Sequence, residues 1–252
     1  AFREKIGVGA EDLLIVTVSR LVKQLKSESL FRTIAAVREL GTQLPLKFAM
    51  VGDGNARGDL ARAAEQANGE LGRDAIVLTG EMLDPRTAYA GADIVVGMGG
   101  SALRGMAFSK PVIVVGEEGF SAPLTPSSAE WFLHHGLYWR GKGRADDATH
   151  TADIRALASD RQGRLAAGVF GREFVQKHFS VEVVCASLDR LFRACLAAGP
   201  APLPVRAFDA ARMWAIRSGR SWVPDRVRHA VKSREERRTV RMGTGGVTDT
   251  LP

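Results

Sequence analysis

The chain has 252 residues, of which 45% are hydrophobic and 25% are charged, a composition typical of a globular protein with one large or two small domains. No apolar run approaches the roughly 18–20 residues that a membrane-spanning helix needs. The two cysteines and five histidines have no metal-ligand spacing, which argues against a zinc motif and a disulfide scaffold. We therefore expect Cys185 and Cys195 to be buried free thiols.

The net charge of +7 comes from one segment near the C-terminus. Residues 206–241 hold 11 Lys and Arg against 4 Asp and Glu, which accounts for the whole excess. Such a segment is most often a solvated face or a disordered end, and docking on an anionic membrane surface is the functional alternative. Nucleic-acid binding is not expected, because only Trp214 and Trp222 could stack on bases there.

The start of the chain shows neither a signal-peptide pattern nor a methionine. We therefore expect a cytoplasmic protein, alternatively one attached to the inner face of the membrane, and a fragment or separated domain of a longer chain.

Five short apolar runs predict buried strands, and segments with helical spacing lie between them. The strands are expected at residues 13–18, 46–51, 75–78, 93–96 and 112–115. The intervening helices are expected at residues 29–40, 59–67, 85–90 and 102–108. This alternation predicts an α/β fold, a doubly wound, mostly parallel Rossmann-like sheet with right-handed crossovers.

The C-terminal part of the chain is expected to be helical. The helices are predicted at residues 127–134, 151–158, 161–178 and 181–196, followed by a break at Gly199-Pro200. A Pro-rich linker, one helix at residues 206–218 and a disordered basic tail at residues 219–252 come next. We therefore expect a nucleotide-sugar-binding domain at residues 1–198 and an extension at residues 199–252.

A glycine-rich loop follows the fourth predicted strand. It reads Gly97-Met98-Gly99-Gly100-Ser101 and leads into a helix, with Ser101 as the expected N-cap. Because ligands of parallel sheets bind beyond the carboxyl ends of the strands, this loop is the leading candidate for a phosphate site. A tight strand-to-helix turn without a ligand is the alternative.

The order of short motifs resembles the C-terminal, donor-binding half of a GT-B glycosyltransferase, similar to glycosyltransferase family 4. The motifs are Val18-Ser19-Arg20-Leu21 with Lys26, Val51-Gly52-Asp53-Gly54, Leu78-Thr79-Gly80 with Tyr89-Ala90-Gly91-Ala92-Asp93, Leu103 to Pro111, and Phe179-Ser180. The first resembles the family's G-R-L…K-G segment, and the fourth its L-E-A-M-A-x-G-x-P helix. Each motif alone is weak, but the ordered set is strong.

The resemblance implies transfer of a sugar from a nucleotide-diphosphate sugar, such as a UDP-sugar, to an acceptor with retention and without a metal. Arg20 and Lys26 would contact the diphosphate, with Lys23 as the alternative cation. The backbone of Gly99, Gly100 and Ser101 would donate to it. Gly54 and Gly80 are further substrate-binding candidates. The acceptor would bind to an N-terminal domain absent from this sequence, so no catalytic base is expected here.

The sequence departs from the family where two glutamates are usual. Arg104 stands in place of the second glutamate, and the first is lost with a shortened loop. Arg104 cannot accept a hydrogen bond from a hydroxyl, so we expect it to contact phosphate or uridine carbonyls. Glu117 and Glu118 are the candidate replacements for binding sugar or ribose hydroxyls.

Two other functions remain open on the sequence. Loss of both glutamates suits a non-catalytic nucleotide-binding or scaffolding module that keeps the half-fold. A nucleotide-sugar epimerase is the third alternative, although no histidine precedes His134.

Overall fold

The computed structural model describes residues 2–24, 26–141, 147–199 and 203–219. The chain divides into a compact unit that ends at Ser180 and a second unit that begins at Val181. The sequence predicted this boundary after residue 198, so the helix Val181–Ala198, which was expected in the first domain, belongs to the second unit.

The first unit is built on a sheet with the strand order β3-β2-β1-β4-β5-β6. The strands are β1 (Leu13–Val18), β2 (Leu46–Val51), β3 (Ile76–Gly80), β4 (Ile94–Gly97), β5 (Val112–Val115) and β6 (Ser121–Pro123). β1 to β5 pair in parallel, and β6 is antiparallel to β5. The prediction of a mostly parallel, doubly wound sheet is confirmed.

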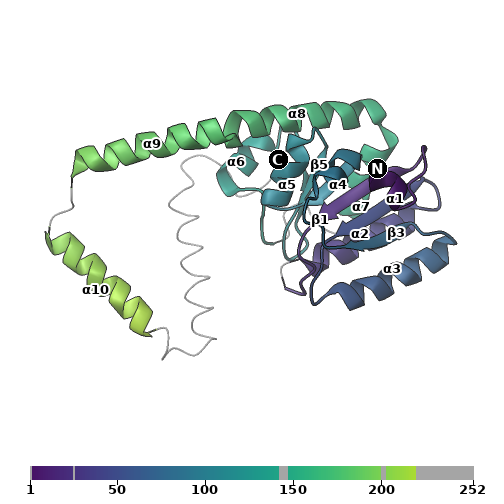
Figure 1. Cartoon of the computed structure of the whole chain (residues 1–252), viewed down its shortest axis with the longest axis horizontal. Helices are drawn as coiled ribbons and strands as arrows, with labels where there is room; N and C mark the ends of the chain where they lie inside the picture. The colour runs from purple at the N-terminus through teal and green to yellow at the C-terminus, as the bar shows by residue number, and fades with distance from the viewer. Residues whose placement is uncertain (1, 25, 142–146, 200–202, 220–252) are drawn as a thin grey trace. The chain divides into compact units, whose positions relative to one another are not determined.

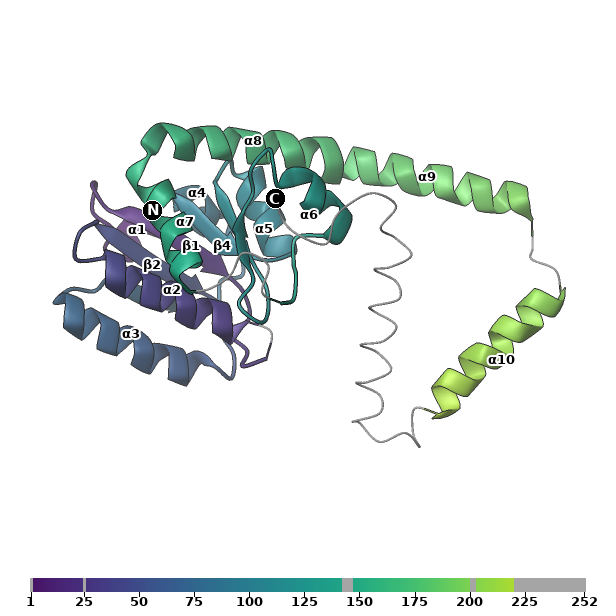
Figure 2. The same ribbon diagram turned by 180° about the vertical axis from the view of Figure 1, so that it is seen from behind.

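Helices cover both faces of this sheet, with α8 and α3 on opposite sides of it in both views (Figures 1 and 2). One face packs against α2 (Ser27–Leu40), α3 (Arg57–Leu71) and α7 (Asp147–Ser159). The other packs against α1 (Phe2–Lys5), α4 (Arg86–Gly91), α5 (Gly100–Ala107), α6 (Ala129–His135) and α8 (Arg161–Phe179). Alternate residues of the central strands enter the two cores: in β1, Ile15 belongs to the first and Leu14 and Val16 to the second.

The short helix α1 and the strand β6 were not predicted from the sequence. Each is too short to show a period, since α1 has four residues and β6 has three. Both are held by tertiary contacts: Phe2 is buried in the second core, and β6 pairs with β5.

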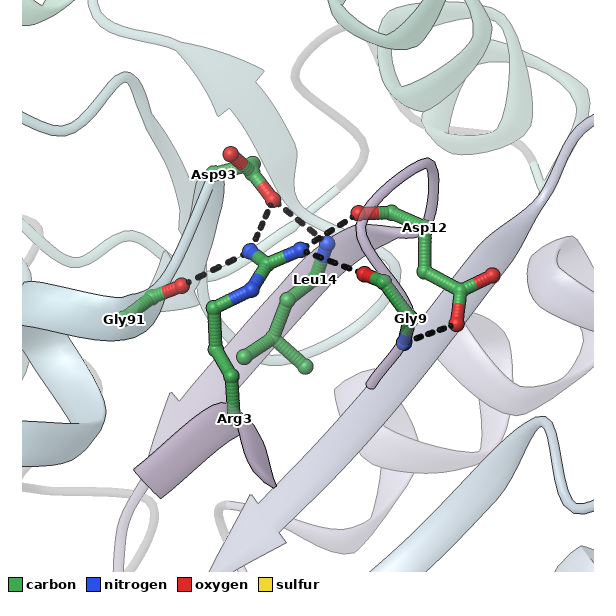
Figure 3. Close-up of polar contacts among 6 residues, drawn as sticks. All are labelled: Arg3, Gly9, Asp12, Leu14, Gly91 and Asp93. Atoms are coloured by element: carbon green, nitrogen blue, oxygen red, sulfur yellow. Dashed lines mark hydrogen bonds and ion pairs between the residues drawn. The ribbon is translucent and has the colours of Figure 1, made fainter. Parts of the chain in front are cut away.

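Arg3 fixes the amino-terminal segment to the amino ends of β1 and β4 (Figure 3). Its guanidinium donates to Asp93 Oδ2 at 2.7 Å, to the Gly91 carbonyl at 3.1 Å and to the Asp12 carbonyl at 2.6 Å. The same Asp93 oxygen accepts from the Leu14 amide at 2.8 Å. Asp93 therefore braces the amino ends of two central strands, at the end of the sheet opposite the expected site.

The second unit contains α9 (Val181–Ala198) and α10 (Leu203–Gly219), as the sequence predicted for both segments. Gly199 ends α9 with a positive φ of 67°, as expected. Cys185 and Cys195 are free but exposed on α9, so the expectation that they are buried is wrong. Residues 220–252, which include most of the expected tail, lie outside the described residues.

Candidate functional site

Ser19, which directly follows the carboxyl end of β1, and Lys26 meet the start of α5 around a small cavity. The cavity has a volume of about 10 Å³, and its lining includes Ser19, Lys26, Gly97 and Ser101. The structure thus brings the predicted cation Lys26 to the carboxyl ends of the central strands, beside the predicted glycine loop.

The Gly52-Asp53-Gly54 turn supports the Ser19 to Leu21 segment through backbone contacts. The Ser19 amide donates to the Val51 carbonyl at 3.0 Å, and the Leu21 amide donates to the Asp53 carbonyl at 2.8 Å. A Cβ at position 52 would lie 1.9 Å from the Ser19 carbonyl oxygen. The close approach of the two backbones therefore accounts for a glycine here.

Of the candidate glycines, Gly54 belongs to this turn and Gly80 lies beside it. A Cβ at position 54 would lie 2.4 Å from the Leu21 carbonyl oxygen, and both glycines have positive φ. Gly80 ends β3 and accepts from the Gly52 amide at 2.9 Å. Packing and backbone conformation thus explain both glycines without a ligand.

Lys26 is half-buried and lies near the exposed Arg20. Burial lowers the pKa of the Lys26 ammonium below its ordinary value, and the positive charge of Arg20 lowers this pKa further. Neither cation forms an ion pair with a carboxylate within the described residues. Two neighbouring cations without a carboxylate partner favour the binding of an anion.

Lys23, the alternative cation, is directed to another partner. Its ammonium forms an ion pair with Asp59 at 2.9 Å, and its side chain is 61% exposed. Of the two lysines, only Lys26 lines the cavity.

The glycine loop adopts a different cap from the one predicted. Gly99, with φ of 52°, is the N-cap of α5, and its amide donates to the Leu137 carbonyl at 2.7 Å. Ser101 lies inside the helix, where its hydroxyl is 3.1 Å from the Tyr89 hydroxyl, so its prediction as N-cap is wrong. Within the described part of the chain, the amides of Gly100 and Ala102 donate to no carbonyl. The helix start therefore keeps two N–H groups that could meet an anion.

Arg104 lies exposed on α5, near the buried Tyr89. Burial raises the pKa of the Tyr89 hydroxyl, whereas the hydrogen bond to Ser101 and the charge of Arg104 lower it. Arg104 thus lies one helix turn beyond the glycine loop, in the last turn of α5.

Glu117 and Glu118 both contact side chains of the 136–140 segment. Glu117 accepts from the Tyr138 hydroxyl at 2.6 Å, and Arg140 Nε lies 3.4 Å from Glu117 and 3.0 Å from Glu118. Burial and the hydrogen bond to Glu117 raise the pKa of Tyr138 well above its ordinary value. Any hydroxyl that these carboxylates bind would share them with Arg140 and Tyr138.

Sequence reasoning missed the residues that position this acidic loop. Glu28, in the first turn of α2, accepts from the amides of Glu118 and Gly119, and Arg32 donates to the Gly119 carbonyl at 2.7 Å. Glu118 has a φ of 54°, a conformation that is uncommon for a residue other than glycine. No local pattern marks these contacts, because the partners are about 90 residues apart in the chain.

The described residues contain no group of three or more His, Cys, Asp or Glu that could hold a metal ion. Over the same residues, no helix is both long and apolar enough to cross a membrane.

Residues 12–134 match the family model described as "Glycosyl transferases group 1". Among curated protein sequences, no match to this chain is found. Solved structures with a similar fold include a TarM mutant from S. aureus in complex with fondaparinux, alpha-GlcNAc-glycerol and UDP. It is 21% identical with a TM-score of 0.54, over 71% of this chain and 35% of that chain.

Two further solved structures have the same fold. Alr3699/HepE from Anabaena, in complex with UDP, is 16% identical with a TM-score of 0.56, over 77% of this chain and 52% of that chain. A glycosyltransferase from Rickettsia africae ESF-5 is 16% identical with a TM-score of 0.58, over 77% of this chain and 50% of that chain.

The chain spans about one third to one half of the length of these solved proteins. Its first unit has the Rossmann-like fold found in GT-B glycosyltransferases, and residues 12–134 within it match the glycosyl transferases group 1 family.

Proposed function

We propose that the chain is the donor-binding half of a retaining, family 4-like GT-B glycosyltransferase. It would bind a UDP-sugar and transfer the sugar to an acceptor held by an N-terminal domain absent from this sequence. The observation that carries this proposal is the pair of cations, Arg20 and Lys26, at the carboxyl edge of the sheet. The UDP in the TarM and HepE structures supports the choice of nucleotide.

The chemistry of transfer needs positive charge at this place. As the glycosidic bond breaks, negative charge develops on the β-phosphate of the leaving nucleotide. Fixed cations stabilise this charge without a metal ion, provided that they are in place before the reaction. Arg20 and Lys26 would supply the charge, and the amides at the start of α5 would supply further donors.

The remaining candidates would take the other parts of the donor. Glu117 and Glu118 would accept hydrogen bonds from ribose or sugar hydroxyls, and Arg104 would donate to phosphate or to a uracil carbonyl. Gly80 would let the nucleotide approach the backbone closely, and Gly54, whose Cβ direction is filled by the Leu21 carbonyl, would contact the donor through its backbone.

Titration calorimetry with UDP, GDP, uridine and guanosine tests the proposal directly. The protein is expected to bind each diphosphate more tightly than its nucleoside, since the cations recognise phosphate. Equal affinity for UDP and uridine would contradict a phosphate site at this edge.

A non-catalytic nucleotide-binding module is the second candidate. Arg104 favours it, because this residue replaces an acid that would hold a ribose hydroxyl. Both candidates bind UDP, but only the enzyme consumes a UDP-sugar. An acceptor-binding domain encoded upstream in the same gene, with sugar transfer by the longer protein, would support the enzyme.

For location, we propose the cytoplasm, with the basic segment at residues 206–241 resting on an anionic membrane surface. Co-sedimentation with anionic and neutral vesicles tests this attachment. Binding to the anionic vesicles is expected to weaken as salt screens the charges.

A further inference from the structure

The hydroxyl of Ser19 has no hydrogen-bond partner within the described residues, although its oxygen is buried from solvent. A buried hydroxyl without a partner is costly, so such a group in a native protein usually serves a ligand or an ordered water. Ser19 lies at the carboxyl end of β1 and lines the small cavity beside Lys26.

The other hydroxyls that line this cavity are already engaged. Thr17 donates to the Val96 carbonyl at 2.7 Å, and Ser29 donates to the Lys26 carbonyl at 3.0 Å. Ser101 is 3.1 Å from the Tyr89 hydroxyl. Ser19 is therefore the hydroxyl in this lining that keeps its donor for something that enters the cavity.

The size of the cavity limits what can enter. Its volume of about 10 Å³ is close to the smallest space that holds one water-sized oxygen atom. A whole phosphoryl group or sugar ring does not fit, but one oxygen of a phosphate bound at the mouth does. Lys26 also lines this cavity, and a cation beside it favours an oxygen that carries negative charge.

We infer that Ser19 is a further donor-binding residue, whose hydroxyl donates to a phosphate oxygen that enters this cavity beside Lys26. This inference rests on the proposed function. Ser19 stands where the related G-R-L motif has glycine, so the contact would be a property of this chain. The shared chemistry is a diphosphate oxygen, which could come from a nucleoside diphosphate or from free pyrophosphate.

The test is calorimetry of the full chain with UDP, pyrophosphate and uridine, together with the melting temperature without ligand. Ser19→Ala is expected to lower the affinity for UDP about tenfold, because one hydrogen bond to a charged oxygen is lost. The affinity for uridine is expected to stay the same. If Ser19→Ala lowers the affinity for pyrophosphate by the same factor as for UDP, the hydroxyl contacts the diphosphate and not the nucleoside. The melting temperature is expected to stay the same or rise, since the hydroxyl has no partner among the described residues.

Two variants sharpen the comparison. Ser19→Gly also lacks the hydroxyl and is expected to lower the affinity for UDP by the same factor as Ser19→Ala. Ser159→Ala, an exposed serine of α7, is the matched control and is expected to bind UDP like the wild type.

The outcomes separate the inference from the proposed function. If the wild type prefers UDP over uridine and Ser19→Ala keeps the same UDP affinity, the inference is wrong and the proposed function stands. If Ser19→Ala lowers the melting temperature while UDP affinity is unchanged, the hydroxyl holds a structural water, which also overturns the inference. If the wild type binds UDP no better than uridine, the proposed function itself fails.

Discussion

The guanidinium of Arg20 lies close enough to Lys26 for its charge to lower the pKa of the Lys26 ammonium, in the same direction as burial of that ammonium does. Both effects penalise the charged lysine in the ligand-free protein. Two like charges at one edge of a sheet are costly to keep together, and an anion placed between them offsets that cost. We therefore expect a change at either residue to alter the affinity for an anion.

Replacement of Arg20 by alanine is expected to lower the affinity for UDP and to leave the affinity for uridine unchanged. The expected loss is about 1.5 kcal/mol, or roughly tenfold in affinity, the lower end for a charged hydrogen bond because Arg20 is exposed. Arg62→Ala, whose exposed side chain pairs with Asp59 on α3, is the matched control in calorimetry. A ratio of UDP to uridine affinity that does not change in Arg20→Ala would exclude Arg20 from the site.

The lowered pKa of Lys26 predicts a pH dependence of binding. The ammonium attracts an anion only while it is protonated, so UDP affinity is expected to fall as the pH rises, starting below the ordinary lysine value of 10.5. Lys26→Arg keeps its charge throughout this range and is expected to lose this dependence. Calorimetry between pH 7 and pH 10 measures both proteins.

The same pKa has the opposite effect on the ligand-free protein. Because the folded state disfavours the ammonium, the contribution of Lys26 to the free energy of unfolding is expected to rise with pH from the folded pKa up to 10.5. Affinity that falls while this contribution rises is the signature of a desolvated lysine. UDP affinity that is equally dependent on pH in Lys26→Arg would rule out Lys26 as the titrating group.

The glycine at position 52 is expected to be intolerant of a side chain. A Cβ there would lie 1.9 Å from the Ser19 carbonyl oxygen at a φ of 138°, so Gly52→Ala is expected to cost about 2 kcal/mol or more of unfolding free energy. Gly69→Ala on α3, where a Cβ would meet nothing within 4 Å, is expected to leave stability unchanged or raise it by about 0.5 kcal/mol. Chemical denaturation of both variants checks the contrast, and equal stabilities would disprove the close backbone approach.

Loss of the Arg3 side chain is expected to destabilise the fold and spare the site. Arg3→Met removes donors from Asp93 and two carbonyl oxygens at the amino edge of the sheet, and we expect a loss of about 1–2 kcal/mol. UDP affinity of the folded variant should equal that of the wild type, because Arg20 and Lys26 lie at the opposite edge. A change in affinity as large as that of Arg20→Ala would contradict this separation of edges.

Local pattern was sufficient for most of the sheet and its helices. The run Leu13 to Val18 predicted β1 with its bounds, because a strand buried on both faces is apolar throughout. The Ser101 cap was wrong because capping depends on one φ angle: Gly99 adopts the positive φ, and Ser101 then lies inside the helix next to Tyr89.

The sequence by itself determined that this is an alternating α/β chain, that Arg20 and Lys26 follow its first strand, and that a glycine loop follows its fourth. These features are local, since each depends on residues within one turn or one strand. Only the tertiary structure decided that Lys26 and not Lys23 lines the cavity, that Glu28 holds the loop of Glu118, and that Ser19 keeps a buried donor. Those choices depend on which distant segments pack together and how their hydrogen bonds are shared, and no local pattern in a single sequence records them.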